Sequence, residues 1–126
     1  MVNVRISTRC FPTEDRDKVV SAVTRLFPDC VLVGDDVLRG ETSTLDEFSE
    51  LLRRQRIRDS ARSVLRRGLR GDSTSFKINK QVAAVGKVSF SEESHPLGDI
   101  EVTITDANIA SVIDSIAPDT RKEALK

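Results

Sequence analysis

Arginines recur every four residues through the middle of this 126-residue chain. A guanidinium group is planar, stays charged, and can grip a phosphate with two parallel hydrogen bonds. Side chains four residues apart on a helix lie on the same side, so the spacing predicts a slowly spiralling band of positive charge. We call the following residues the arginine series: Arg54, Arg58, Arg62, Arg66 and Arg70 at the four-residue spacing, widened by Arg53, Arg56 and Arg67.

Positive charge is concentrated in the middle third of the chain, although the formal net charge of the whole chain is zero. Residues 53–87 contain eleven Lys or Arg and two Asp, a net charge of +9, whereas residues 1–52 sum to −4 and residues 88–126 to −5. Asp59 is the only acidic residue inside the arginine series, so pairing within that segment cannot neutralise it. This asymmetry predicts a local anion-binding surface.

Two sources of anion fit the arginine series. One is the phosphate backbone of a nucleic acid, the common electrostatic partner of clustered arginines. The other is an acidic surface of the same fold or of a partner subunit, which would make the series structural. The acidic side chains considered for such pairing are Glu41, Asp46, Glu47, Glu50, Glu92, Glu93 and Glu101. The sequence leaves both alternatives open.

A second group of polar and basic side chains follows the arginine series. These side chains could donate hydrogen bonds to phosphates or bases, or form an ordinary solvated strand face. They are Lys77, Asn79, Lys80, Gln81 and Lys87. The chain has no Trp or Tyr, and its five Phe lie mostly at core-phase positions, so stacking on exposed aromatic rings is not favoured. A structured RNA, contacted through its shape and backbone, fits these features better.

The residue types needed for catalysis or metal binding are sparse. His95 is the sole histidine and Cys10 and Cys30 are the only cysteines, so a zinc site lacks ligands. Asp99 with Glu92 or Glu93 could hold Mg²⁺, but no motif supports such a site. No glycine-rich phosphate loop or nucleophile elbow is present. We therefore expect no cofactor, no metal and no enzyme activity.

The chain contains no apolar run approaching the roughly 20 residues that a membrane span requires. Its first ten residues alternate like a strand and lack the charged-then-apolar order of a secretory signal. Two thiols without such a signal are typical of a reducing compartment. These features predict a cytoplasmic protein.

Alternating and helical hydrophobic patterns predict a single α+β domain over residues 1–120, with an antiparallel or mixed sheet covered by helices. A charged tail, expected to be frayed, follows at residues 121–126. The expected strands are 2–7, a hairpin of 30–33 and 37–39, the pair 76–79 and 87–90 around a bend at 82–86, and 100–104. The expected helices begin after caps at Thr13, Thr44 and Asp106, with Glu47 completing a capping box. A change in apolar phase near Gln55 predicts a kink or two consecutive helices in the second helical region.

Four segments of the sequence resemble an archaeal family, uncharacterised protein family 201. They are residues 51–62 (LLRRQRIRDSAR), 76–87 (FKINKQVAAVGK), 97–100 (LGDI) and 113–120 (IDSIAPDT). The resemblance implies RNA binding, a homodimer, and an α+β fold like that of the large-subunit ribosomal protein that holds the 5S RNA. Together with the residues, it predicts a non-catalytic protein that contacts RNA phosphates through an arginine-rich helix. The alternative is a protein-interaction or structural module whose basic helix docks on an acidic protein surface.

Overall fold

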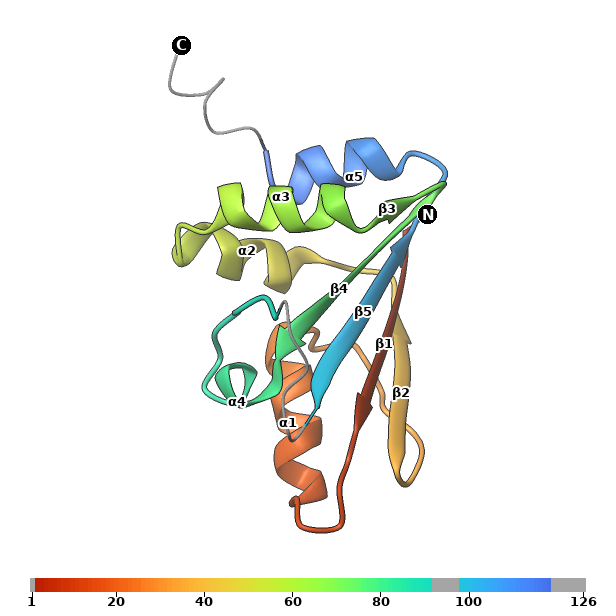
Figure 1. The fold of residues 1–126 in the computed structure, drawn as a ribbon, viewed down its shortest axis with the longest axis vertical. Coiled ribbons are helices and arrows are strands. Elements are labelled where there is room, and N and C mark those ends of the chain that lie inside the picture. Colours follow the sequence, from red (N-terminus) through yellow and green to blue (C-terminus); the bar gives the residue numbers. More distant parts are fainter. Residues whose placement is uncertain (1, 92–97, 119–126) are drawn as a thin grey trace.

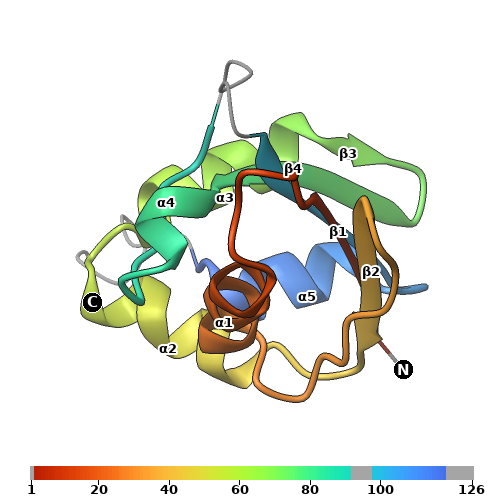
Figure 2. The ribbon, with the colours of Figure 1, turned by 90° about the horizontal axis from the view of Figure 1, so that it is seen from below.

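The computed structural model describes residues 2–91 and 98–118. One antiparallel sheet, in the strand order β2-β1-β5-β4-β3, has helices gathered on one side of it (Figures 1 and 2). Its strands are β1 (Asn3–Arg9), β2 (Val37–Thr42), β3 (Leu69–Arg70), β4 (Ser73–Asn79) and β5 (Asp99–Thr105). The helices are α1 (Arg16–Leu26), α2 (Asp46–Arg54), α3 (Arg58–Arg67), α4 (Lys80–Ala83) and α5 (Ile109–Ile116). The predicted single α+β domain is confirmed, and the predicted tail at 121–126 lies outside the described residues.

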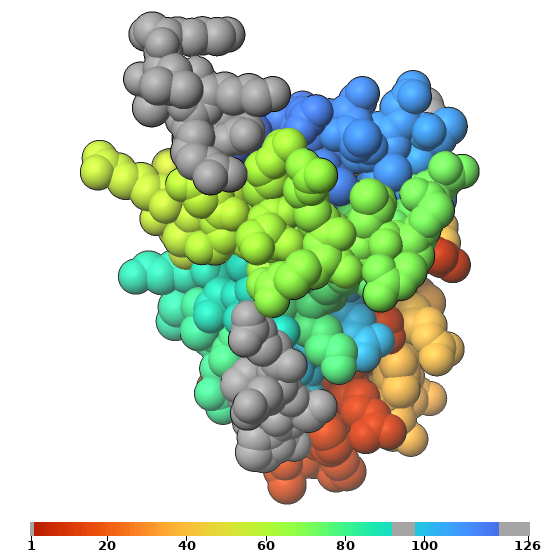
Figure 3. All heavy atoms as spheres, turned by 45° about the horizontal axis from the view of Figure 1, so that its top comes forward, coloured from red at the N-terminus to blue at the C-terminus, as the bar shows by residue number. Residues whose placement is uncertain are grey.

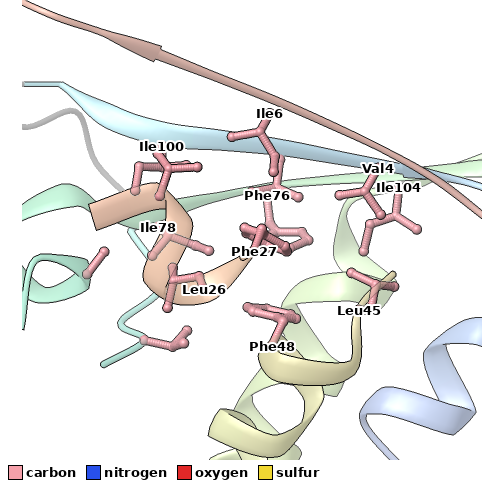
Figure 4. Close-up of a cluster of buried hydrophobic side chains, with 14 of the residues drawn as sticks. Val4, Ile6, Leu26, Phe27, Leu45, Phe48, Phe76, Ile78, Ile100 and Ile104 are labelled. Carbon is pink, nitrogen blue, oxygen red and sulfur yellow. The ribbon is translucent and has the colours of Figure 1, made fainter. Parts of the chain in front are cut away.

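The two faces of the sheet follow from strand alternation. In β1, Val4 and Ile6 point into the core while Arg5 and Ser7 point to the opposite face. The inward side chains of β1 and β5 meet Leu26 and other apolar side chains of the helices (Figure 4). One apolar face and one polar face per strand is the pattern expected when only one side of a sheet is covered.

A row of aromatic rings joins the helices to the sheet. Phe27, after α1, stacks on Phe48 of α2 at 5.3 Å between ring centroids, and Phe48 stacks on Phe76 of β4 at 5.7 Å. Phe90 continues the row with a T-shaped contact to Phe76, also at 5.7 Å. Offset and edge-to-face aromatic contacts are favourable beyond their buried area. The row fixes α2, and with it the start of the arginine series, against the sheet.

The second helical region is two helices, because α2 ends in a Schellman motif. The backbone N–H of Ile57 donates to the carbonyl of Leu52 (3.1 Å), and that of Arg56 donates to the carbonyl of Arg53 (3.1 Å). Arg56 has φ +58°, the left-handed conformation that this motif requires and that glycine usually supplies. The phase change at Gln55 therefore marks a complete helix break.

Two predicted strand pairings are each reduced to a single antiparallel bridge. Residues 30–33 do not form a hairpin with β2, since only Val33 bridges to Arg39 and β2 pairs along its length with β1. Residues 87–90 contribute only the bridge from Phe90 to Ile78, and α4 extends into the start of the expected bend. In both cases the strand pairs along its length with a distant strand on one edge, and the predicted neighbour keeps a single antiparallel bridge on the other edge.

The predicted helix caps are also wrong by one to two residues. Asp15, rather than Thr13, caps α1 by accepting a hydrogen bond from the N–H of Asp17. The N-cap of α2 is Leu45, and the Thr44 hydroxyl accepts from Asp46 in place of a capping box. For α5 the N-cap is Asn108, whose N–H donates to the Asp106 carboxylate.

Candidate nucleic-acid interface

The arginine series does not lie on one helix as predicted. Arg53 and Arg54 end α2, Arg56 lies in the break, four members lie on α3, and Arg70 lies on β3. The two helices nevertheless cross the molecule as one continuous band, between α5 on one side and residues 80–91 on the other (Figure 3). The series therefore forms a single surface region, although the break changes the direction of its side chains.

The arginines at the end of α2 pair with acidic residues of the same helix. Arg53 binds Glu50 at 2.6 Å, and Arg54 binds Glu47 at 3.1 Å. The hydrogen bond from Arg53 lowers the pKa of the Glu50 carboxyl, and the same bond raises the pKa of Arg53. The Arg53 side chain is 62 % exposed. Exposed pairs of this kind contribute little to stability, so a phosphate can replace the carboxylate partner.

Arg62 has a structural role. Its Nη1 donates to the Asp114 carboxylate of α5 at 2.6 Å and to the backbone carbonyl of Ala117 at 3.2 Å. The side chain is only 20 % exposed. Ala117 is the C-cap of α5, where carbonyls lack helical partners and a cation is favoured. Arg62 thus ties α3 to the end of α5. This is the type of contact expected if the arginines pair with acidic residues of the same fold, although Asp114 was not among the predicted partners.

The remaining members of the series differ in what they touch. Arg70 donates to the backbone carbonyls of Leu69 (2.7 Å) and Arg67 (3.3 Å), which folds its side chain over the turn into β3. Arg56 and Arg66 are exposed, and the structure records no ion pair for either within residues 2–91 and 98–118. These two are the arginines best placed to meet an external anion.

A side-chain clamp brings Lys87 to the arginine series. Gln55 Nε2 donates to the carbonyl of Val88 (3.0 Å), and the N–H of Val88 donates to Gln55 Oε1 (2.6 Å). Lys87, the residue immediately before Val88, is exposed beside this clamp. A Nη atom of Arg25 also lies 3.7 Å from the position that a Cβ on Gly86 would occupy. Sequence reasoning identified Lys87 but missed Gln55 and Arg25, because nothing in the sequence links these segments.

The other predicted polar residues are dispersed. Lys80 is 5 % exposed and donates to the Glu14 carboxylate (3.0 Å) and the carbonyl of Arg9 (2.7 Å), so it is part of the interior. The side chain of Asn79 accepts from the N–H of Val82 and caps α4. Gln81 is exposed on α4, and Lys77 is exposed on the uncovered face of the sheet.

The uncovered face of the sheet carries charges of both signs. Arg5 lies opposite Glu41, and Lys77 opposite Glu101, in neighbouring strands. A hollow of about 640 Å³ opens there beside two exposed apolar side chains of the sheet edge, Val31 (75 % exposed) and Val33 (66 % exposed). Mixed charge offers less attraction to a polyanion than the arginine series does.

Among residues 2–91 and 98–118, no three His, Cys, Asp or Glu side chains come together as a metal site. The sole histidine, His95, and the possible Mg²⁺ ligands Glu92 and Glu93 lie outside the described residues. No helix within the described ranges has the length and apolar character to cross a membrane.

Comparison with known proteins shows which family the chain belongs to. A family model described as RNA binding matches residues 3–105, which include every residue of the proposed interface. The chain belongs to this RNA-binding family. It is 42 % identical to a UPF0201 protein of Methanothermobacter thermautotrophicus over 94 % of this chain and 93 % of that protein. It is 39 % identical to a UPF0200/UPF0201 protein of Archaeoglobus fulgidus, of whose length it spans 38 %.

Solved structures of the UPF0201 family share the fold. The crystal structure of a UPF0201 protein from Methanococcus jannaschii superposes with a TM-score of 0.86 at 37 % identity, covering 93 % of each chain. The resemblance to uncharacterised protein family 201 is therefore confirmed. The likeness to the 5S-RNA-binding ribosomal protein stays a prediction.

Proposed function

We propose that this UPF0201 protein binds structured RNA through the exposed members of the arginine series, without catalysing a reaction. The observation that carries the proposal is the number of exposed guanidinium groups on one surface region. The segment 53–67 contains a single acidic residue, Asp59. Its exposed arginines are Arg53, Arg54, Arg56, Arg66 and Arg67. Lys87 adds a further cation through the Gln55 clamp. The family model described as RNA binding supports the same reading.

The conformation of Arg56 gives further support. A non-glycine residue in the left-handed region costs roughly 1 kcal/mol or more, and glycine is the residue that helix ends normally use there. An arginine in this position lowers stability while adding an exposed cation at the turn between α2 and α3. Such strain is typical of positions kept for function.

Salt dependence and a matched pair of variants test the proposal. With four or five phosphate contacts, we expect RNA affinity to fall about 150- to 500-fold between roughly 50 and 200 mM salt. Arg56→Gln with Arg66→Gln should weaken binding at low salt and reduce the slope of log affinity against log salt by about 2, since each phosphate contact contributes roughly 0.9. Fluorescence anisotropy with a labelled RNA hairpin measures both quantities.

The control removes the same number of exposed arginines from the uncovered face of the sheet. Arg5→Gln with Arg39→Gln should leave affinity and slope close to those of the unaltered protein. Equal losses in the two double variants would mean that the arginine series is not the interface. A protein that binds no RNA at low salt would remove the proposal altogether, and would favour docking of the basic segment on an acidic protein surface.

We also propose a homodimer, which rests on the family resemblance. Light scattering should then give twice the mass of the chain at micromolar concentration, and a monomer mass would contradict the proposal.

The free thiols of Cys10 and Cys30 support the proposed cytoplasmic location.

A further inference from the structure

A groove of about 570 Å³ runs along the exposed side of α3, next to the arginine series. Its apolar lining comes from Ile57, Val64 and the ring of Phe90, all partly exposed side chains that pack on the core. Its polar lining comes from Ser60, Ser63, Asp59 and Arg67. The volume lies within the range of about 300–1,000 Å³ that is usual for small-ligand sites.

The segment that carries Phe90 is held in place on both sides. Asn79 N–H donates to the carbonyl of Ser89 (2.8 Å), and Ser91 N–H donates to that of Lys77 (2.9 Å), so residues 89–91 lie along β4. Gln55 holds the preceding residue, Val88, through two hydrogen bonds. The T-shaped contact with Phe76, at an interplanar angle of 69°, sets the ring orientation. The aromatic wall of the groove is therefore positioned before any ligand arrives.

The composition of the groove matches a nucleobase. A base has apolar faces that pack on aromatic and aliphatic side chains, and a polar edge that exchanges hydrogen bonds with hydroxyl and carboxylate groups. Arg67 lines the groove, and Arg66 precedes it on α3. A base in the groove would thus have its own phosphate within reach of the cations already assigned to the RNA backbone. The partly exposed ring of Phe90 runs against the expectation, drawn from the sequence, that stacking on exposed aromatic rings is not favoured.

We infer that this groove takes one unpaired nucleobase of the bound RNA, packed against Phe90 and Val64, while Arg67 and its neighbours hold the adjacent phosphates. The inference rests on the proposed RNA binding and deepens it. It names the structural class of RNA, a duplex interrupted by a bulged or looped-out nucleotide.

The absence of Trp and Tyr from the chain makes a direct optical test possible. Phe90→Trp keeps an aromatic ring in the groove and introduces the sole indole fluorophore. We use three RNA hairpins that share one stem: one with a single bulged nucleotide, one with an abasic residue at the bulge, and one fully paired. The bulged hairpin should bind about tenfold more tightly than the other two, since base stacking on an aromatic side chain contributes about that much. It alone should quench the emission of the introduced indole.

Two further variants act as controls. Val31→Trp places the same fluorophore at the far edge of the sheet, where no hairpin should alter its emission. Ser63→Leu narrows the groove without removing a charge, so it should abolish the preference for the bulged hairpin while leaving affinity for the paired stem unchanged. It tests the groove independently of whether Phe90→Trp folds.

The outcomes separate this inference from the proposed function. Equal affinity of the unaltered protein for the three hairpins, or a Ser63→Leu variant that keeps the bulge preference, would overturn the groove assignment and leave RNA binding in place. Quenching by the abasic hairpin as strong as by the bulged one would also overturn it. Binding to none of the hairpins at low salt would overturn both.

Discussion

Arg62 and Arg66 lie one helical turn apart on α3, and the same substitution should affect different properties at the two positions. We expect Glu at position 62 to lower stability and Glu at position 66 to lower RNA affinity. Arg62→Glu removes the bond of 2.6 Å to Asp114 and the bond of 3.2 Å to the Ala117 carbonyl. It also places a second carboxylate beside Asp114, at the negative end of α5. Because Asp114 is 64 % exposed, we count each of the two bonds at or just below the lower end of the range for charged hydrogen bonds, about 1–1.5 kcal/mol per bond, and expect a total loss of about 2–3 kcal/mol in the free energy of unfolding.

For a domain of this size, that loss corresponds to a fall of about 10 °C in melting temperature. Arg66→Glu, on an exposed side chain, should change the free energy of unfolding by no more than about 0.5 kcal/mol while weakening RNA binding. Far-UV circular dichroism gives the melting curves, since the chain has no Trp or Tyr, and anisotropy gives the RNA affinity. If the two variants melted within about 2 °C of each other, a rough limit set by that exposed-site scatter, the division into structural and RNA-facing arginines would be refuted.

Two other substitutions test the interior and the helix break. Lys80→Met should lower the free energy of unfolding by about 3–5 kcal/mol, because it leaves the largely buried Glu14 carboxylate without its cation, yet RNA affinity measured below the melting transition should not change. Loss of RNA affinity in the folded Lys80→Met variant would contradict its assignment to the interior. Arg56→Gly should raise stability by about 1 kcal/mol, since glycine adopts φ +58° without strain, and should weaken RNA binding. Chemical denaturation and anisotropy measure the two effects, and an unchanged RNA affinity would remove Arg56 from the interface.

Local physical chemistry was enough to predict much of this protein from its sequence. Alternation in β1 separates Val4 from Arg5, and that separation holds whatever the strand pairs with. The change of apolar phase at Gln55 marked the break between α2 and α3, since a helix cannot keep two different apolar faces toward one core. The concentration of arginine identified the most positively charged region of the chain, because net charge within a segment does not depend on how the segment packs.

Only the tertiary structure decided what each cation does. Arg62 meets Asp114, 52 residues away, and Lys80 meets Glu14, 66 residues away. Both cations look in sequence like Arg66, yet the packing of distant elements gives each a carboxylate partner, buries Lys80 and half-buries Arg62. The groove on α3 has the same origin, since Phe90 reaches it only because residues 88–91 lie beside β4 and Gln55. The carboxylate partners of these cations depend on which distant segments the core brings together, so they cannot be predicted from the spacing of side chains along the chain.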